Sequence, residues 1–302
     1  MAVSVAEYLG VRADKLPNIK PVTNLASKPE VPCPFRIGPC LKVAKAQHPI
    51  CSVRVSTSND VWIVCEHRLC ATQPKTADLN EHQQQILRQV ADTVYPRSVP
   101  DGELEFKREV SIPIATTRYH ADYVMRTGTE LRHANIVEMQ GGGETAGTEK
   151  LTKHVLEWAG SESPTNEHLV KKSAANPIVT NAWRRQQEQF IIKGGVATRT
   201  GGKMIFCVGT MLYDYVISRL ETATLKDLRR DNWTLALLAF KEDPSKPAPR
   251  CAPNSIQYTI DEERTVFTDY STFVQALANQ GDAQSEIFQG EFTTLDNKRV
   301  SR

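Results

Sequence analysis

Two acidic residues and a glutamine, set in two short apolar stretches, are the residues of this sequence best suited to chemistry. Asp122 lies in the stretch 119–125, and Glu138 and Gln140 follow in the stretch 135–140. Residues i and i+2 of a strand point to one face, so Glu138 and Gln140 should project together, beside Asp122 if the two strands are neighbours. Carboxylate and amide oxygens suit Mg²⁺. Because such an ion lowers the pKa of a bound water and stabilises charge on a phosphodiester, the spacing predicts a nuclease site with Mg²⁺ on Asp122 and Glu138.

A cluster of cysteines near the start of the chain points to a second, structural metal. In a cytosolic chain, clustered cysteines favour a metal over disulfides, and thiolates hold zinc or iron tetrahedrally. Cys65 lies in the apolar stretch 61–65, where a small buried hydrophobe is its expected role. The other four lie at turns or segment ends and are the predicted ligands: Cys33, Cys40, Cys51 and Cys70. Cys65 stays open as the alternative to Cys70, and the paired CxxC spacing of a zinc ribbon is absent.

These motifs resemble the PD-(D/E)xK nuclease superfamily, with Gln140 where the usual lysine stands. Glu-x-Gln followed by glycines 141–143, together with the upstream cysteines, resembles the NotI and EagI restriction endonucleases within it, and 302 residues is closer to the shorter EagI-like members. The resemblance covers the cysteine segment and residues 105–148. The departure at Gln140 matters, because an amide can orient water but supplies no positive charge.

The resemblance implies a type II restriction endonuclease that acts as a homodimer on double-stranded DNA. It further implies a GC-rich palindrome with a GGCC core, CGGCCG being the expected site. The structural metal would be iron held by cysteines alone, while the cysteine spacing itself leaves zinc open. The implied fold is α/β, a restriction-endonuclease-like mixed sheet flanked by helices, with an N-terminal four-cysteine module.

Periodicity and turn residues divide the chain into a metal-binding module at 1–75 and a catalytic and DNA-recognition domain at 76–302. Residues 80–94, 151–158 and 179–190 have helical spacing, and 193–203 is expected to be a flexible basic loop. Strands are expected at 51–56 and 61–65 as a hairpin, and at 104–114, 119–125, 135–140 and 204–208. Glu109, on the strand 104–114, could reach the metal as a third carboxylate or be a solvated strand residue, and Glu81 is a weaker candidate for that role.

Charge is distributed unevenly along a chain whose net charge is only +2. Lys and Arg exceed Asp and Glu in residues 1–75 and 161–203, whereas acids predominate after residue 260. Local basic patches favour contact with nucleic acid, and Arg or Lys forks read guanine in the major groove. The candidate DNA-binding residues are Arg184, Arg185, Arg199 and Lys203.

Two other functions fit the same residues. One is a superfamily nuclease of DNA repair or replication that selects structure rather than sequence. The other is a metal-stabilised DNA-binding protein without catalysis, in which the acids at 122 and 138 serve only the fold. No apolar run approaches the ~18 residues that span a bilayer, and the first residues lack the features of a secretion signal, so a cytoplasmic protein without membrane contact is expected.

Overall fold

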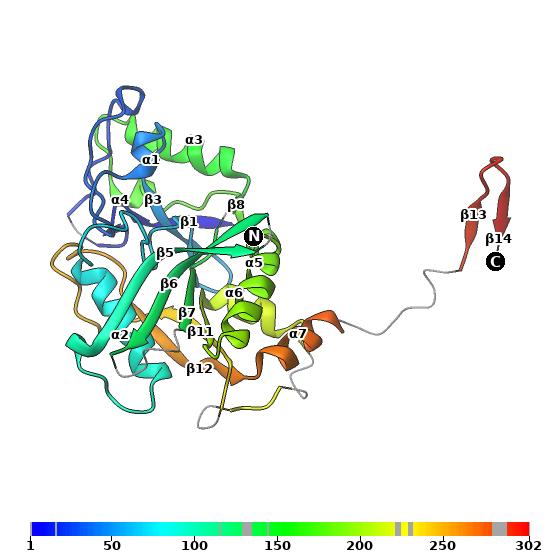
Figure 1. Ribbon diagram of the computed structural model, residues 1–302. Helices are drawn as coiled ribbons and strands as arrows, with labels where there is room; N and C mark the ends of the chain where they lie inside the picture. Colours follow the sequence, from blue (N-terminus) through cyan, green and yellow to red (C-terminus); the bar gives the residue numbers. More distant parts are fainter. Residues whose placement is uncertain are drawn as a thin grey trace.

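A six-stranded mixed sheet forms the centre of the computed structural model, which describes residues 2–15, 17–114, 116–128, 135–143, 145–220, 225–228, 232–279 and 289–301. Its order is β12-β11-β10-β7-β6-β5 (Figure 1). β7, β10 and β11 run parallel, and the other neighbours are antiparallel. The strands are β5 (Leu104–Ile114), β6 (Thr117–Thr127), β7 (Asn135–Gln140), β10 (Met204–Gly209), β11 (Leu235–Glu242) and β12 (Tyr258–Thr268).

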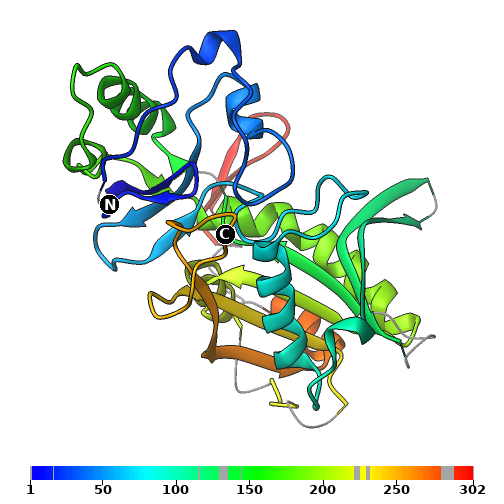
Figure 2. The same ribbon diagram turned by 90° about the vertical axis from the view of Figure 1, so that its left-hand side faces the viewer.

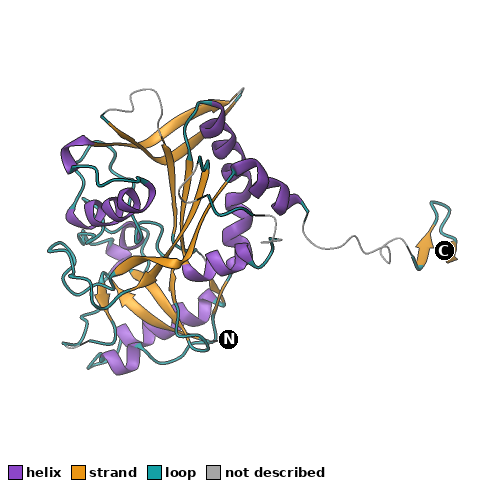
Figure 3. Cartoon of the chain, turned by 90° about the horizontal axis from the view of Figure 1, so that it is seen from below, coloured by secondary structure: helices purple, strands orange, loops and turns teal. Residues whose placement is uncertain are grey.

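Helices cover both faces of this sheet, as Figures 2 and 3 show from two directions. Helix α2 (Glu81–Val94) lies on one face, and α5 (Val179–Arg199), α6 (Thr210–Ile217) and α7 (Tyr270–Ala278) lie on the other. Strand β10 is buried throughout, with Ile205 in the core under α2 and Phe206 in the core under α5. A strand covered on both sides reads as a continuous apolar run, which explains the sequence of β10. No helix among the described residues is long and apolar enough to cross a membrane.

A smaller antiparallel sheet of order β2-β1-β3-β4 is built from the N-terminal residues. Its strands are β1 (Val3–Tyr8), β2 (Val11–Arg12), β3 (Ile50–Val55) and β4 (Val61–Ile63). The elements packed around it or joining it to the large sheet are η1 (Leu25–Ser27), α1 (Leu41–Ala44), β8 (Thr145–Ala146), α3 (Thr148–Ala159), α4 (Asn166–Leu169) and β9 (Asn176–Pro177). The ring of Tyr8 meets Trp158 of α3 edge to face, and one hydrophobic cluster runs from Val3 to α7. Residues beyond the predicted boundary at 75 thus complete the N-terminal unit.

The predicted central elements agree with the structure. Helix α2 begins where its capping signal lies, because the Asn80 side chain accepts from Gln83 N and the Gln83 side chain accepts from Asn80 N. The hairpin of β3 and β4, the strands β5, β6, β7 and β10, and the helix α3 lie at the predicted positions within a few residues. The short η2 (Asp101–Glu103) precedes β5, and β13 (Glu291–Thr293) pairs with β14 (Arg299–Ser301).

The basic loop expected at 193–203 is wrong, because α5 continues to Arg199. Two consecutive glycines suggested a break in the helix, but Gly194 is needed for packing. A Cβ at Gly194 would lie 2.2 Å from Cε2 of Tyr270, so only glycine lets α5 approach α7 this closely. Tertiary packing here overrides the low helix propensity of glycine.

A buried ion pair fixes the loop that follows β4. Arg68 is fully buried, and its guanidinium donates to both carboxylate oxygens of Glu7 on β1. Glu7 also accepts from Ile256 N at 2.9 Å, and Arg68 lies over the ring of Phe35, 4.0 Å from its centroid. Three distant segments of chain therefore hold residues 65–70 in place.

His82, buried at the start of α2, should make the fold sensitive to acid. Its Nε2 lies 3.0 Å from the carbonyls of Arg68 and Leu69, and burial, with Arg68 nearby, lowers the pKa of His82 to about 3. Between the unfolded pKa of ~6.5 and this value only the unfolded chain binds the proton, so the free energy of unfolding should fall by up to ~1.4 kcal/mol per pH unit as the pH drops. Urea unfolding of the parent and of His82→Gln from pH 7 to pH 4.5 measures it: the parent should lose more stability across this range than the variant, and equal losses would contradict the prediction.

Candidate active site

Three carboxylates lie in a row across the neighbouring strands β5, β6 and β7. Strand β6 pairs with β7 through Tyr123 opposite Val137, and the same register carried one residue further sets Asp122 opposite Glu138. On the other side, Arg108 lies opposite Tyr123 and Val110 opposite Ala121, which sets Glu109 opposite Asp122. Side chains directly opposite on one face of an antiparallel pair are close neighbours. The strand order therefore brings together Glu109, Asp122 and Glu138.

Asp122 and Glu138 are each held by a backbone N–H group of the neighbouring strand. Met139 N donates to Asp122 Oδ2 at 2.8 Å, and Asp122 N donates to Glu138 Oε1 at 3.3 Å. Glu138 is 5% exposed, and burial together with the charge of Asp122 raises the pKa of its carboxyl group to about 8. Burial also raises the pKa of Asp122, and Glu109 adds to this effect. Two acids kept close at this electrostatic cost are typical of a functional site.

Lys193 provides the positive charge that contacts this pair. It projects from α5, is 1% exposed, and its Nζ donates to Glu138 Oε2 at 2.7 Å. Sequence reasoning missed this residue because residues 193–203 were interpreted as a loop. A helical reading would have found it, since Gln186, Gln189 and Lys193 are spaced three and four residues apart and so share one helix face.

Glu109 lines the same cavity as Asp122 and Glu138, a space of about 430 Å³. Its backbone has a φ of 50°, in the left-handed region that a residue other than glycine rarely adopts, and Thr72 Oγ1 donates to its carboxylate. Strained backbone of this kind is often found where a side chain is directed to a site. The alternative candidate, Glu81, accepts from Arg250 N at 2.7 Å and does not line this cavity.

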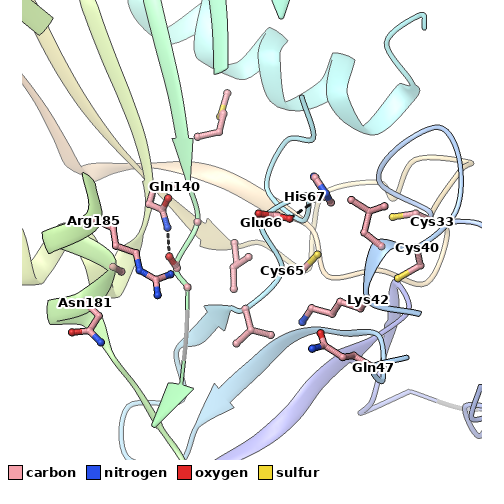
Figure 4. Close-up of a pocket in the computed structure, with 18 of the residues that line it drawn as sticks. Cys33, Cys40, Lys42, Gln47, Cys65, Glu66, His67, Gln140, Asn181 and Arg185 are labelled. Carbon is pink, nitrogen blue, oxygen red and sulfur yellow. Dashed lines mark hydrogen bonds and ion pairs between the residues drawn. The ribbon is translucent and has the colours of Figure 1, made fainter. Parts of the chain in front are cut away.

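Gln140 shares the cavity with Glu138 but is tied to its own surroundings. Its Oε1 accepts from Gln186 Nε2 at 2.7 Å, and its Nε2 donates to the carbonyl of Gly142, the dashed line of Figure 4. Gly141 and Gly142 pack directly on β4, where a Cβ on either would lie 2.8 Å or less from Ile63. The glycine run therefore joins the end of β7 to the N-terminal sheet.

A second cavity of about 350 Å³ adjoins the first and shares Gln140, His67 and Gln186 with it. Figure 4 shows Asn181 and Arg185 of α5 on one side and Lys42 and Gln47 on the other. The open space thus runs from the carboxylates to a wall with amide, lysine and arginine side chains. This wall has two sides, with Asn181, Arg185 and Gln186 from α5 on one and Lys42, Lys45 and Gln47 on the other, and Glu66 also lines the cavity.

The four predicted DNA-binding residues lie in different places. Arg185 lines the second cavity, whereas its exposed neighbour Arg184 lines neither cavity. Arg199 lies in the last turn of α5, and Lys203 has its Nζ over the ring of Trp233, 4.1 Å from the centroid, before β10 begins. Only Arg185 of the four borders the carboxylate region, and Lys42 and Lys45 were not predicted.

The cysteines come together as two pairs, each made by backbone contacts. Cys33 N donates to Gly38 O and Cys40 N to Val31 O, which closes a tight loop around Pro34 to Pro39. Cys65 N donates to Cys51 O at 3.1 Å at the end of the β3–β4 hairpin. The two pairs lie near each other, because Cys33, Cys40 and Cys65 line one cavity and Cys33 packs against the buried cluster that contains Cys51.

Cys70, one of the four predicted ligands, lies apart from the other cysteines of the N-terminal segment. It is 1% exposed, and its Sγ lies 3.3 Å from the hydroxyl of Tyr123 beneath the carboxylate cavity. Its position relative to Cys65 could not be predicted, because it depends on the Arg68 anchor that directs the chain away from the cysteine pairs. The clustered set is Cys33, Cys40, Cys51 and Cys65.

Both clusters have the chemistry for metal, although within the described part of the chain no three His, Cys, Asp or Glu side chains are arranged to hold an ion. At the carboxylates, Lys193 Nζ contacts one oxygen of Glu138, while Glu109, Asp122 and Glu138 line an open cavity with hard oxygen donors. At the cysteines, burial raises the pKa of Cys33 to about 11 and also raises that of Cys51 and Cys65. What fits a metal here is the donor set, since four cysteine sulfurs are the ligands of a tetrahedral zinc or iron site, and binding would displace their protons.

The chain was compared with models of known protein families and with curated proteins. Neither comparison finds a match to this chain. The likeness to restriction endonucleases therefore remains a resemblance of motifs. What the protein does must be argued from its carboxylate row, its two cavities and its cysteine cluster.

Proposed function

We propose that this protein is a Mg²⁺-dependent endonuclease that cleaves double-stranded DNA. The observation that carries the proposal is the row of Glu109, Asp122 and Glu138, lining one cavity that opens onto a wall with Lys42 and Arg185. Clustered carboxylates hold a divalent ion, and the basic wall suits a phosphodiester backbone. A site of this kind needs both features, because the acids alone repel DNA.

Asp122 and Glu138 would hold the metal, with Glu109 as the third carboxylate. When bound there, Mg²⁺ supplies a water of lowered pKa and offsets the charge that develops on the phosphate. Gln140, anchored by Gln186, is suited to orient a water molecule through its amide. The groups at Lys42, Lys45 and Arg185 would hold the phosphates flanking the cut.

The finer proposal is a type II restriction endonuclease, a homodimer acting on a GC-rich palindrome with a GGCC core, with CGGCCG as the expected site. Its support is the motif resemblance, in particular Glu-x-Gln-Gly-Gly-Gly at 138–143 and the cysteine cluster. The four clustered cysteines would carry iron, or zinc as the alternative. Two-fold symmetry in such a dimer would mirror that of the DNA site.

Digestion of a plasmid of known sequence, with and without Mg²⁺, tests the proposal and separates it from the two other functions. Discrete fragments with ends mapped to CGGCCG are expected. A smear, or cuts at branched structures, would favour a repair nuclease. Binding without cleavage at any Mg²⁺ concentration would favour a DNA-binding protein in which the acids only support the fold.

The affinity for DNA should fall as salt rises, and it should depend on the residues of α5 that face the cavity. Arg185→Ala removes a charge at the cavity, while Arg184→Ala removes the same charge one residue away, outside it. If Arg185 contacts a phosphate, its loss should reduce the slope of log affinity against log salt by ~0.9. If it reads a base, its loss should cost ~1–3 kcal/mol and relax one position of the site.

Fluorescence anisotropy in Ca²⁺ on the specific duplex and on a scrambled one, from 50 to 300 mM NaCl, separates these outcomes. Arg184→Ala should bind like the parent. Equal effects of the two substitutions would show that the cavity does not determine where the DNA lies.

A further inference from the structure

Lys193 is the most deeply buried cation at the site, and no motif in the sequence accounts for it. Burying an ammonium group is costly unless it is paired, and the partner of Lys193 is Glu138, at 2.7 Å. The lysine reaches this carboxylate from α5, on the face that also presents Gln186 and Gln189 to the cavity. Two contacts fix the position of Lys193: its own ion pair with Glu138, and the packing of the adjacent Gly194 on Tyr270.

Gln140 and Gln186 are both neutral, so neither can offset the negative charge of the three acids. Gln140 occupies the strand position two residues after Glu138 but is neutral, and its amide is held by Gln186 and the carbonyl of Gly142. The three acids therefore meet only one cationic side chain at hydrogen-bond distance among the described residues that contact them in the row.

We propose that Lys193 is the positioning residue of the carboxylate site: from helix α5 it supplies the positive charge that Gln140 lacks, and it orients Glu138 through their 2.7 Å contact. This inference depends on the proposed nuclease function. It predicts that cleavage requires a positive charge beside Glu138, whether helix α5 or strand position 140 supplies it.

Because Lys193 touches Glu138, its charge also opposes a divalent cation on the same carboxylate. Removing the charge should strengthen metal binding and weaken cleavage at the same time. A lysine with a merely structural role would not separate these two measurements, since collapse of the site would weaken both.

The test compares Lys193→Met, which keeps the length of the side chain without its charge, with the double variant Lys193→Met/Gln140→Lys. Loss of one preorganised electrostatic contact typically lowers kcat by ~10²–10³-fold, and this loss is expected for Lys193→Met. Gln140→Lys in the double variant should restore at least about tenfold of it, because it places a positive charge two residues after Glu138 on the same strand. Lys241→Met is the matched control, because Lys241 forms a 2.9 Å ion pair with buried Asp261 on the same sheet, away from the cavity.

Calcium binding, measured by titration calorimetry without DNA, gives the readout that does not depend on turnover. Ca²⁺ affinity should rise in Lys193→Met and return toward the parent value in the double variant, while circular dichroism and melting temperature confirm folding. Parent-like cleavage by Lys193→Met, or cleavage and calcium affinity falling together without rescue, would overturn the role of Lys193. If the parent binds Ca²⁺ but does not cleave DNA, the proposed function fails first, and with it the role of this lysine in cleavage.

Discussion

Replacement of Asp122 by asparagine is expected to reduce DNA cleavage by about a thousandfold or more, since a metal centre contributes several kcal/mol and each ~1.4 kcal/mol is tenfold in rate. Asparagine keeps the shape and can still accept from Met139 N, so the fold should be retained. Because Asp122 lies among like charges that raise the pKa of Glu138, the variant should be no less stable than the parent. Glu138→Gln should lose cleavage to the same extent.

Glu105→Gln is the matched control for these variants. Glu105 lies on β5 but forms an exposed ion pair with Arg126 at 2.6 Å and does not line the cavity. Single-turnover cleavage of a labelled duplex in Mg²⁺ measures the rates, and binding in Ca²⁺ and thermal melting confirm that the variants are intact. Substantial cutting by purified Asp122→Asn would show that the carboxylate row is not the reaction centre.

The second large effect is expected at the cysteine cluster, where Cys65→Ser and Cys70→Ser should differ sharply. Elemental analysis of the parent should find about one iron or zinc per chain. Loss of one ligand removes part of the ~10–16 kcal/mol that a structural metal can contribute to folding. A loss of ~4 kcal/mol corresponds to a fall in melting temperature of roughly 6 °C for a chain of this size.

Cys65→Ser should therefore lose both the metal and this stability, whereas Cys70→Ser should keep the metal. Cys70 contacts Tyr123 in the core, so its replacement should cost only the usual penalty of a buried polar substitution, ~1–3 kcal/mol. Metal retained in Cys65→Ser and lost in Cys70→Ser would show that Cys70, and not Cys65, is the fourth ligand. A stable parent without iron or zinc would contradict the metal altogether.

The positions of Asp122 and Glu138 could be predicted from sequence because each follows from local periodicity. Both acids stand in apolar strands, and the alternation of strand side chains sets the face on which each lies. The helix α2 could be predicted as well, since its apolar residues recur at helical spacing, and the capping box of Asn80 and Gln83 then fixes where it begins. These are short-range patterns that a single sequence contains in full.

The continuation of α5 past its two glycines and the cysteine pairing depend on contacts between distant residues, and could not be predicted from local patterns. The path of α5 past Gly194 is decided by Tyr270, 76 residues later in the chain. Cys65 and Cys70 are separated by the anchoring of Arg68 to Glu7, which the spacing of the cysteines does not reveal. In both cases a local rule was overridden by packing elsewhere.

The close contact between Gly194 and Tyr270 locks helix α5 along its own axis. A helix that slides by one residue moves its side chains by about 1.5 Å and turns them by about 100°, which would carry the ammonium of Lys193 away from Glu138. The lock itself lies on α7, whose Tyr270 also donates its hydroxyl to the carbonyl of Ile191. Gly194→Ala adds one methyl group that touches no carboxylate, yet it should loosen the contact with Tyr270. It should lower the cleavage rate by more than its effect on the melting temperature would account for. The carboxylate row is in this sense aligned from α7, by a tyrosine ring that lines neither of the two cavities.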